Sequence, residues 1–473
     1  MLVMKFGGSS VADGARIGRV ADLVRATAAE TGHATPIVVV SAMGGVTDSL
    51  FALARAALSG RAGQGAALDG VEALRRRHQE VLDLFADGVT DETTAQLAAY
   101  RAELRDIAVG VSLLGELSPR SLDAITGYGE KLSTLLVAAA LRARGVPARP
   151  VSAEDVVVTD ATFGNAVPDM AATTRQAAMH LATLVRGGVV PVVTGYIGAT
   201  PAGVTTTLGR NGSDYSAAIV GAAVGAEEIW IWTDVDGVLT ADPRLVPAAR
   251  PLPTLTYAEA SELAYFGSKV IHPRTIVPAV AAGVPIRIKN TFNPTHPGTL
   301  IAAAGALEPG AVKAVTIIRD LALVAVEGLG MLGVPGIAAR TFGAIAGANV
   351  NVLMFSQASS ESNIALVVAR RDVADAVDAL RAAFAPELAR HEVDAVRAHE
   401  GVAILTVVGR DMRGTPGVAG RLFGALGRAD VNVIAIAQGS SEISISCVVR
   451  GDETADEALR AIHREFVEEE SRL

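Results

Sequence analysis

Lys5 stands at the end of a short apolar run and is followed by two glycines and two serines, in the order MKFGGSS. Glycines allow the backbone to approach a ligand closely, and Ser9 or Ser10 could cap a helix that follows. A lysine beside exposed backbone amides at the start of a helix suits a phosphate group. The residues alone leave a plainer interpretation open, in which a surface lysine ends a strand and an ordinary turn follows.

A second glycine-rich turn, LGRNGSD, places Arg210 and Asp214 close together. A guanidinium can bind a carboxylate through two parallel hydrogen bonds, so Arg210 could hold an acidic substrate. Asp214 could orient lysines around a transferring phosphate or help to place a metal. Ser213 and Asp214 are also good helix caps, so a simple capping turn is the alternative.

A third stretch, WTDVDGVLTADPR, carries three carboxylates and a guanidinium, namely Asp234, Asp236, Asp242 and Arg244. Its carboxylates could reach Mg²⁺ or ribose hydroxyls, but the twelve-residue calcium-loop pattern is absent. The alternative is a solvated turn. In FGSKVIHP, Lys269 could meet a nucleotide, whereas His272 before proline is better explained as structural.

Several common catalytic patterns are missing. The sequence has no G-x-x-x-x-G-K-[ST] motif and no protein-kinase set of H-R-D and D-F-G. It also lacks H-E-x-x-H, and no G-x-G-x-x-G follows the first apolar run. These absences exclude the P-loop NTPases, the protein kinases and the zinc peptidases that use H-E-x-x-H.

The elements that must position these residues alternate between strands and helices. Four short β-branched runs, each leading into a Gly, Ser or Thr turn, predict buried parallel strands at 37–40, 189–193, 229–232 and 284–288. An α/β architecture with right-handed crossovers follows, and ligands in such sheets bind beyond the carboxyl ends of the strands. We expect a catalytic domain at 1–300 with a helical insertion at about 60–110, and a linker at 301–315.

The last third of the chain contains a tandem repeat of one sequence unit. The stretch from Gly328 recurs from Gly409 without a gap, and Gln357 corresponds to Gln438. Each copy predicts strand, Pro-Gly turn, helix, strand, loop and strand, in domains at 316–395 and 396–473. As buried-edge amides, Gln357 and Gln438 could donate and accept at once, which suits an amino acid. Duplicated loop residues or a dimer interface are the alternatives.

Composition limits the possible partners. The chain has 473 residues and a net charge of −9, which argues against general nucleic-acid binding, and an ATP site would need local cations. Its single cysteine, Cys447, excludes a disulfide within the chain and a structural thiolate-zinc site. No signal-peptide pattern or membrane-length apolar run is present, so we expect a cytoplasmic protein without a membrane partner.

Six ordered motifs together resemble the amino-acid-kinase fold family and, within it, the aspartate kinases. They are KFGGSSV, SAMGGVTD, GYGEKLS, LGRNGSDYSA, WTDVDGVLTADPR and FGSKVIHPRT. The repeat resembles the paired ACT domains of these enzymes. SQASSE and AQGSSE are most similar to the kinase half of threonine-sensitive bifunctional aspartokinase–homoserine dehydrogenases. The resemblance implies a largely parallel sheet with helices on both faces, followed by two βαββαβ-like ACT domains of the α+β class.

The resemblance assigns roles to individual residues. Lys5 and Asp214 become catalytic, with Lys5 neutralising ATP phosphates beside Gly7 and Gly8 and with Asp214 organising the cations. The substrate side is lined by Ser41 and Thr47, while Glu130 binds the amino group of aspartate and Arg210 pairs with a carboxylate. The nucleotide is held by Thr233, Asp234, Arg244 and Lys269. Leu239 stands where many of these enzymes carry tyrosine, so this residue supplies no aromatic contact to the nucleotide.

The implied reaction is ATP + L-aspartate → ADP + 4-phospho-L-aspartate, with Mg²⁺ and with no metal site of the protein's own. Because an aspartate carboxyl has a pKa of about 3.9, the acceptor is already ionised and needs no general base. The resemblance also implies inhibition by threonine or lysine through Gln357 and Gln438, and a homodimer or homotetramer formed through the ACT domains. Two alternatives stay open, another amino-acid kinase acting on glutamate or acetylglutamate, and an amino-acid sensor without activity.

Overall fold

A computed structural model describes residues 1–30, 35–267, 272–303, 312–358 and 362–468. The chain forms two compact units, which are considered separately. Unit 1 contains residues 1–238, 253–257 and 270–305, and unit 2 contains residues 239–252, 258–269 and 306–473. Unit 2 therefore includes two segments that come from the first 300 residues. Lys269, predicted to contact a nucleotide, lies outside the described residues.

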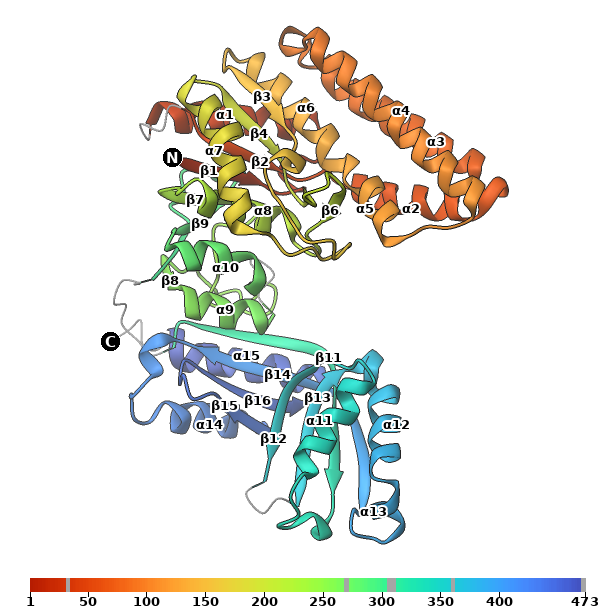
Figure 1. The fold of residues 1–473 in the computed structure, drawn as a ribbon. Helices are drawn as coiled ribbons and strands as arrows, with labels where there is room; N and C mark the ends of the chain where they lie inside the picture. Colours follow the sequence, from red (N-terminus) through yellow and green to blue (C-terminus); the bar gives the residue numbers. More distant parts are fainter. Residues whose placement is uncertain (31–34, 268–271, 304–311, 359–361, 469–473) are drawn as a thin grey trace. The chain divides into compact units, whose positions relative to one another are not determined.

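Unit 1 is built around an eight-stranded sheet in the order β3-β4-β2-β1-β7-β9-β10-β8 (Figure 1). Its strands are β1 (Leu2–Phe6), β2 (Ile37–Val40), β3 (Ala148–Val151), β4 (Val190–Thr194), β7 (Glu228–Thr233), β8 (Thr254–Thr256), β9 (Ile286–Asn290) and β10 (Thr299–Ala302). Neighbours are parallel except β9 and β10. The predicted largely parallel sheet is confirmed, and all four predicted strands lie in it. A small hairpin, β5 (Ile197–Ala199) and β6 (Thr205–Thr207), stands apart from this sheet.

Helices cover both faces of the sheet. Leu2, Met4 and Phe6 of β1 pack in one core with α1 (Gly14–Glu30) and α6 (Tyr128–Arg142). Side chains alternate along a strand, so Val3 and Lys5 point to the opposite face. There α8 (Gly212–Ala223) contacts β1 and packs against α7 (Met170–Arg186) and α10 (Pro273–Ala282). Within the described residues, no helix is both long and apolar enough to cross a bilayer.

The region expected to be a helical insertion contains two long helices. They are α3 (Gln64–Asp83) and α4 (Asp91–Leu114), which Figure 1 shows in orange beyond the sheet. They pack with α2 (Val46–Leu58), and α5 (Pro119–Thr126) follows them. The core that they share with α6 is apolar, as the Ala- and Leu-rich sequence requires.

The expected capping of α1 by Ser9 or Ser10 is wrong. The helix begins at Gly14, and its first turn is capped by Asp13, whose Oδ1 accepts the Arg16 amide at 2.9 Å. Ser10 instead exchanges a hydrogen bond of 2.7 Å with Thr291, next to β9. Residues 7–13 thus form a longer turn between β1 and α1, in which Ser10 and Val11 are buried.

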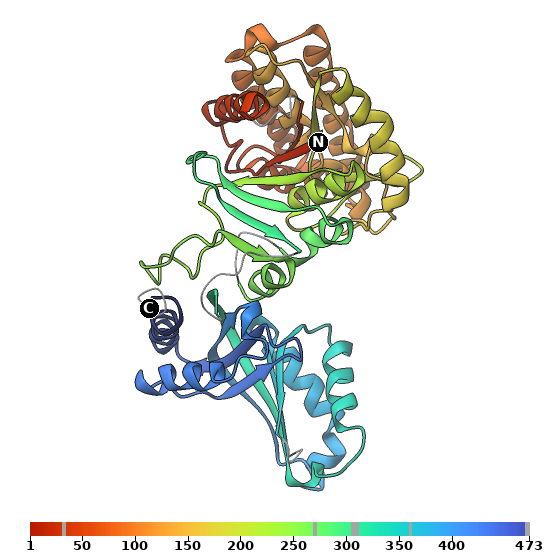
Figure 2. The same ribbon diagram turned by 90° about the vertical axis from the view of Figure 1, so that its left-hand side faces the viewer.

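Unit 2 contains a six-stranded antiparallel sheet in the order β12-β13-β11-β14-β16-β15. Its strands are β11 (Ala314–Glu327), β12 (Val352–Gln357), β13 (Asn363–Ala369), β14 (Ala395–Val408), β15 (Ala435–Gln438) and β16 (Ser444–Arg450). Helices α11 (Ile337–Gly347), α12 (Val373–Ala383) and α13 (Ala385–Ala389) belong to the first copy, and α14 (Val418–Arg428) and α15 (Asp452–His463) to the second. Figure 2 lets the helices of each copy be followed by colour, from teal to light blue for the first copy and from blue to dark blue for the second.

The two long strands β11 and β14 each serve both copies. Residues 321–327 of β11 pair with β13, and residues 402–408 of β14 pair with β16. Where β11 and β14 pair with each other, residues 314–318 lie opposite 404–408, and residues 322–327 lie opposite 395–400. Each half of the sheet therefore takes one part of a strand from the other half. The boundaries proposed from the sequence stay predictions, but no single cut point separates the halves.

The sheet of unit 2 buries both faces. The helices of the first copy cover Val324 and Val326, and those of the second copy cover Ala403 and Leu405. A register shift between Ile318 and Leu321 reverses the alternation along β11, so that Val315 faces the helices of the second copy and Val324 faces those of the first. On the opposite face, one apolar cluster that includes Leu323 and Ile404 runs across both halves, and Phe266 packs against it.

Candidate functional site

Lys5 and Asp214 form an ion pair at the carboxyl end of β1. Lys5 faces α8, and Asp214 lies in the first turn of that helix, so Lys5 Nζ and Asp214 Oδ1 are 2.5 Å apart. The side chains are only 9% and 14% exposed, so water screens the pair weakly. This arrangement holds a cation in a fixed place at the edge of the sheet where parallel-sheet proteins bind their ligands.

Two glycine-containing loops flank this ion pair. A Cβ on Gly7 would lie 3.3 Å from Lys5 Nζ, and a Cβ on Gly8 would lie 3.5 Å from the Ala42 carbonyl oxygen. The Ser41 amide donates to the Phe6 carbonyl at 3.1 Å, so the loops after β1 and β2 run side by side. A side chain at position 7 would lie close to the ammonium group and would require Lys5 to shift by a few tenths of an ångström. The two loops therefore lie beside each other at the end of the strand that carries Lys5.

Glu130 lies in the first turn of α6 and is only 4% exposed. Its Oε1 accepts the Ala42 amide at 3.1 Å, and within the described chain its buried Oε2 has no hydrogen-bond partner. Burial raises the pKa of this carboxyl to about 8. A buried oxygen without a partner is costly, and a cationic donor arriving from a ligand would satisfy it. Sequence reasoning assigned Glu130 only through the family resemblance.

Arg210 is exposed in the turn between β6 and α8. The turn uses two residues with positive φ, Gly209 at 81° and Asn211 at 55°, which bring the chain sharply into the helix. Sequence reasoning missed the residue that anchors it. Asp123, buried in α5, accepts the amide and the hydroxyl of Thr207, both at 2.8 Å. No motif surrounds Asp123, so no local signal could have identified it.

Ser41 and Thr47 lie where β2 leads into α2, and both are half-buried. Arg77 of α3, which sequence reasoning also missed, binds this loop from the insertion. Its Nη2 donates to the Gly44 carbonyl at 2.7 Å and to the Ala12 carbonyl at 3.3 Å. One guanidinium therefore joins the loop after β1 to the loop after β2. An arginine in an Arg-rich helix carries no signal of this contact.

The predicted nucleotide residues divide between the two units. Thr233 ends β7 in unit 1 and Asp234 follows it, and the Thr233 hydroxyl donates to Asp234 at 3.2 Å. Arg244 belongs to unit 2, is largely exposed and pairs with Asp242 at 2.5 Å. The structure therefore brings Lys5, Gly7, Gly8 and Asp214 together, but it does not place Arg244 in the same compact unit as them.

The two glutamines end equivalent strands, Gln357 in β12 and Gln438 in β15, and both are exposed. The expectation of a buried-edge amide is therefore wrong, because each strand ends at the border of the sheet. Gln438 lines a pocket of about 330 Å³ together with the turn of residues 414–419, Glu442 and Ile445. Glu442 closes one wall by accepting the Gly414 amide at 3.0 Å. Glu361, its counterpart in the first copy, lies outside the described residues.

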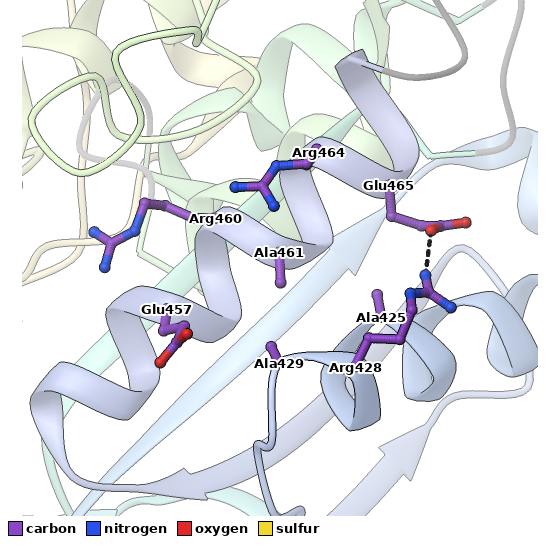
Figure 3. Close-up of a pocket in the computed structure, with 8 residues that line it drawn as sticks. All are labelled: Ala425, Arg428, Ala429, Glu457, Arg460, Ala461, Arg464 and Glu465. Atoms are coloured by element: carbon purple, nitrogen blue, oxygen red, sulfur yellow. Dashed lines mark hydrogen bonds and ion pairs between the residues drawn. The ribbon is translucent and has the colours of Figure 1, made fainter.

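A different hollow of about 340 Å³ lies between α14 and α15 (Figure 3). Its walls carry Arg428, Arg460 and Arg464, and Arg428 is bound to Glu465 at 2.5 Å. Arg428 and Arg460 lie in the last turns of their helices, where cations are favoured by the helix dipole. None of the residues predicted from the sequence lines this hollow, so we assign it no ligand.

Comparison with known families gives matches over both units. The Amino acid kinase family model matches residues 1–290, and the ACT domain model matches residues 324–384 and 405–466. The chain is 39% identical over 469 residues to the chloroplastic bifunctional aspartokinase/homoserine dehydrogenase 1 of Zea mays, covering 98% of this chain and 50% of the maize protein. It thus spans about half the length of that relative.

Two further relatives are covered over most of their length. The chloroplastic aspartokinase 1 of Arabidopsis thaliana is 33% identical over 485 residues, which cover 98% of this chain and 80% of that protein. Crystal structures of E. coli aspartokinase III, one with aspartate and ADP and one with lysine and aspartate, match at 32% identity. Both give a TM-score of 0.78 and cover 98% and 99% of this chain, respectively, and 99% of the E. coli chain.

Proposed function

The chain belongs to the amino acid kinase family, in its aspartokinase branch with paired ACT domains, and from this we propose that it phosphorylates the side-chain carboxylate of L-aspartate with ATP. The observation that carries the proposal is Glu130, whose buried Oε2 lacks a partner beside the loops that flank Lys5. That oxygen suits the ammonium group of an amino acid. The E. coli relative binds aspartate and ADP.

In the proposed reaction, a carboxylate oxygen of aspartate forms a bond to the γ-phosphorus as the bond to the β,γ-bridging oxygen breaks, and ADP leaves. Lys5 neutralises charge on the transferring phosphoryl group, and Asp214 holds the ammonium in place. Glu130 orients the substrate through its amino group, and Arg210 binds a carboxylate. Mg²⁺ arrives with ATP as part of the substrate, where it shields the phosphate charges. No residue has to remove a proton, because the acceptor is ionised.

The test of this activity is a coupled assay of ADP release by the purified chain with Mg²⁺ and ATP. We expect turnover with L-aspartate and none above background with L-glutamate or N-acetylglutamate. Preference for either of the other acceptors would identify a different amino-acid kinase. Effector binding without turnover on any acceptor would identify a sensor that lacks catalysis.

Arg77 is predicted to position the loops after β1 and β2. Arg77→Ala should lower kcat/KM for aspartate by about tenfold to a hundredfold, because a charge-assisted hydrogen bond contributes about 1.5–3 kcal/mol and two loop carbonyls lose their donor. Arg77→Lys, which retains one donor, should recover part of the loss. Arg75→Ala is the matched control on the same helix, since Arg75 bonds to Glu72. Equal kinetics in Arg77→Ala and the parent would exclude the role.

The regulatory part of the proposal is inhibition by an amino acid, with threonine favoured and lysine as the alternative. The pocket at Gln438 supports it, because backbone amides at the start of α14 and the carboxamide can meet a carboxylate and an ammonium group. The E. coli relative has been crystallised with lysine. A homodimer or homotetramer through the ACT domains is part of the same proposal, supported by Phe355 and Ile436, which are exposed on the edge strands β12 and β15.

Gln438→Ala should raise the threonine concentration for half-inhibition by about tenfold or more, because a hydrogen bond to a charged ligand group contributes about 1.5–3 kcal/mol. Uninhibited turnover should stay near that of the parent. Gln357→Ala is the matched variant in the first copy, and comparison of the two dose–response curves separates the copies. If both variants remain as sensitive as the parent to threonine and to lysine, the glutamines do not bind the effector.

For the compartment, we propose the cytoplasm, where a lone buried thiol such as Cys447 stays reduced.

A further inference from the structure

Helix α9 (Tyr257–Tyr265) connects the two units along the chain. It follows β8, the last strand of the eight-stranded sheet, without a break. Its first residue, Tyr257, belongs to unit 1, and its hydroxyl donates to the Val284 carbonyl at 2.8 Å. Its remaining residues belong to unit 2. The helix therefore continues, along the chain, directly from a strand of the eight-stranded sheet.

Two carboxylates of α9 hold the two segments that form the Gln438 pocket. Glu259 Oε1 accepts the Arg410 amide at 2.8 Å, and Arg410 opens the short turn that leads to Met412 and Gly414 of the pocket wall. Glu262 Oε2 accepts the Ser444 hydroxyl at 2.7 Å, immediately before Ile445.

The contact at Glu259 is deeply buried. Its side chain is 0% exposed and pairs with Lys313 at 3.5 Å, just before β11 begins. A buried carboxylate is tolerated only when its oxygens are paired and hydrogen-bonded, so the Arg410 amide and Lys313 must stay close to it. The position of the pocket turn is thereby tied to the position of α9.

The first copy lacks the same pair of contacts within the described residues. The counterparts of Arg410 and Ser444 in the repeat are Leu329 and Asn363. Leu329 is 72% exposed, and the Asn363 amide donates to Glu327 of β11. Helix α9 meets the first copy elsewhere, where the Tyr265 hydroxyl donates to the Leu353 carbonyl of β12.

We propose that Glu259 and Glu262 couple the pocket of the second copy to the catalytic unit. This inference rests on the proposed regulation by an amino acid. An effector that rearranges the turn after Arg410 or the segment before Ser444 moves the groups that donate hydrogen bonds to Glu259 and Glu262. A ligand shifts a conformational equilibrium only through contacts that differ between the two states, and these hydrogen bonds supply such a difference. The second copy is thus the one whose occupancy acts on β8 through α9.

The experiment removes the hydrogen bond between Ser444 and Glu262 in two separate variants, Ser444→Ala and Glu262→Ala. Asn363→Ala, at the same repeat position in the first copy, is the matched control. ADP formation is measured without effector and with saturating L-threonine, and L-lysine is tested in parallel. Calorimetry follows the binding of each amino acid. We expect both variants to bind the effector and to turn over like the parent without it. Their residual activity at saturation should rise about fivefold or more, since allosteric coupling is typically worth 5–150-fold.

Each other outcome has a distinct meaning. If the parent is inhibited and both variants are inhibited equally, the coupling role is overturned while the proposed regulation stands. Loss of effector binding in the variants would make these residues part of the pocket and would also overturn coupling. The same gain of residual activity in Asn363→Ala would remove the assignment to the second copy. A parent that neither amino acid inhibits would refute the proposed regulation, and this inference with it.

Discussion

Lys5→Met should reduce kcat for aspartate-dependent ADP release by a factor of about 10²–10³ or more, since loss of one preorganised group at a developing charge commonly costs that much. The substitution keeps most of the side-chain volume, so the loss reflects the ammonium group. Steady-state kinetics with saturating ATP and aspartate measure it. A variant that retains more than about a tenth of the parent's activity would exclude the phosphate-neutralising role.

The same variant leaves Asp214 without its partner in a nearly buried position. Removing one member of such a pair destabilises a protein by about 3–5 kcal/mol, because the remaining charge is poorly solvated. The double variant Lys5→Met/Asp214→Asn should recover most of this stability in denaturant unfolding and should remain inactive. This comparison separates loss of chemistry from loss of folding. Recovery of activity together with stability would show that Lys5 is only structural.

Glu130→Gln should raise the KM for aspartate by about tenfold to a hundredfold, because a charge-assisted hydrogen bond to the substrate's ammonium group is worth about 1.5–3 kcal/mol. The KM for aspartate should depend on pH in the parent and should not do so in the variant. With a pKa of about 8, the free carboxyl is largely protonated at pH 7 and must release its proton to accept an ammonium group. KM for aspartate should therefore fall between pH 7 and pH 9.

Calorimetry can measure directly the release of this proton when aspartate binds. Aspartate binding at pH 7 in buffers of different ionisation enthalpy should show release of close to one proton by the parent and of none by Glu130→Gln. The stability of the parent should also depend on pH because of this carboxyl group. Burial raises the pKa from 4.5 to about 8, so between these pH values the folded protein keeps a proton that the unfolded chain has lost. The free energy of unfolding therefore falls as pH rises from about 4.5 to about 8 and levels off above it. A flat pH profile for both KM and stability in the parent would contradict the assignment.

The sequence by itself determined the local features of this protein. Runs of β-branched residues ending in Gly, Ser or Thr predicted the parallel strands, because a strand buried on both faces needs such residues and its loop needs freedom to turn. The repeat predicted two related α+β halves, and each half contains the expected helix, with Ile345 on the buried face of α11. The motifs also singled out Lys5 and Asp214 as candidates, although no spacing could show that residues so far apart in the chain form an ion pair.

Only the tertiary structure decided which residues meet. Sheet order places β1 between β2 and β7, so Lys5 of β1 faces α8 and the loop after β2 comes to lie beside the loop after β1. Asp123 and Arg77 secure this site from helices, and no pattern around them signals such contacts. Likewise, the repeat indicated two ACT-like domains in succession. In the structure, β11 and β14 extend through both halves of the sheet, because each strand has pairing partners in both halves. Local structure follows from neighbouring residues, but a contact between distant segments depends on how every element in between packs.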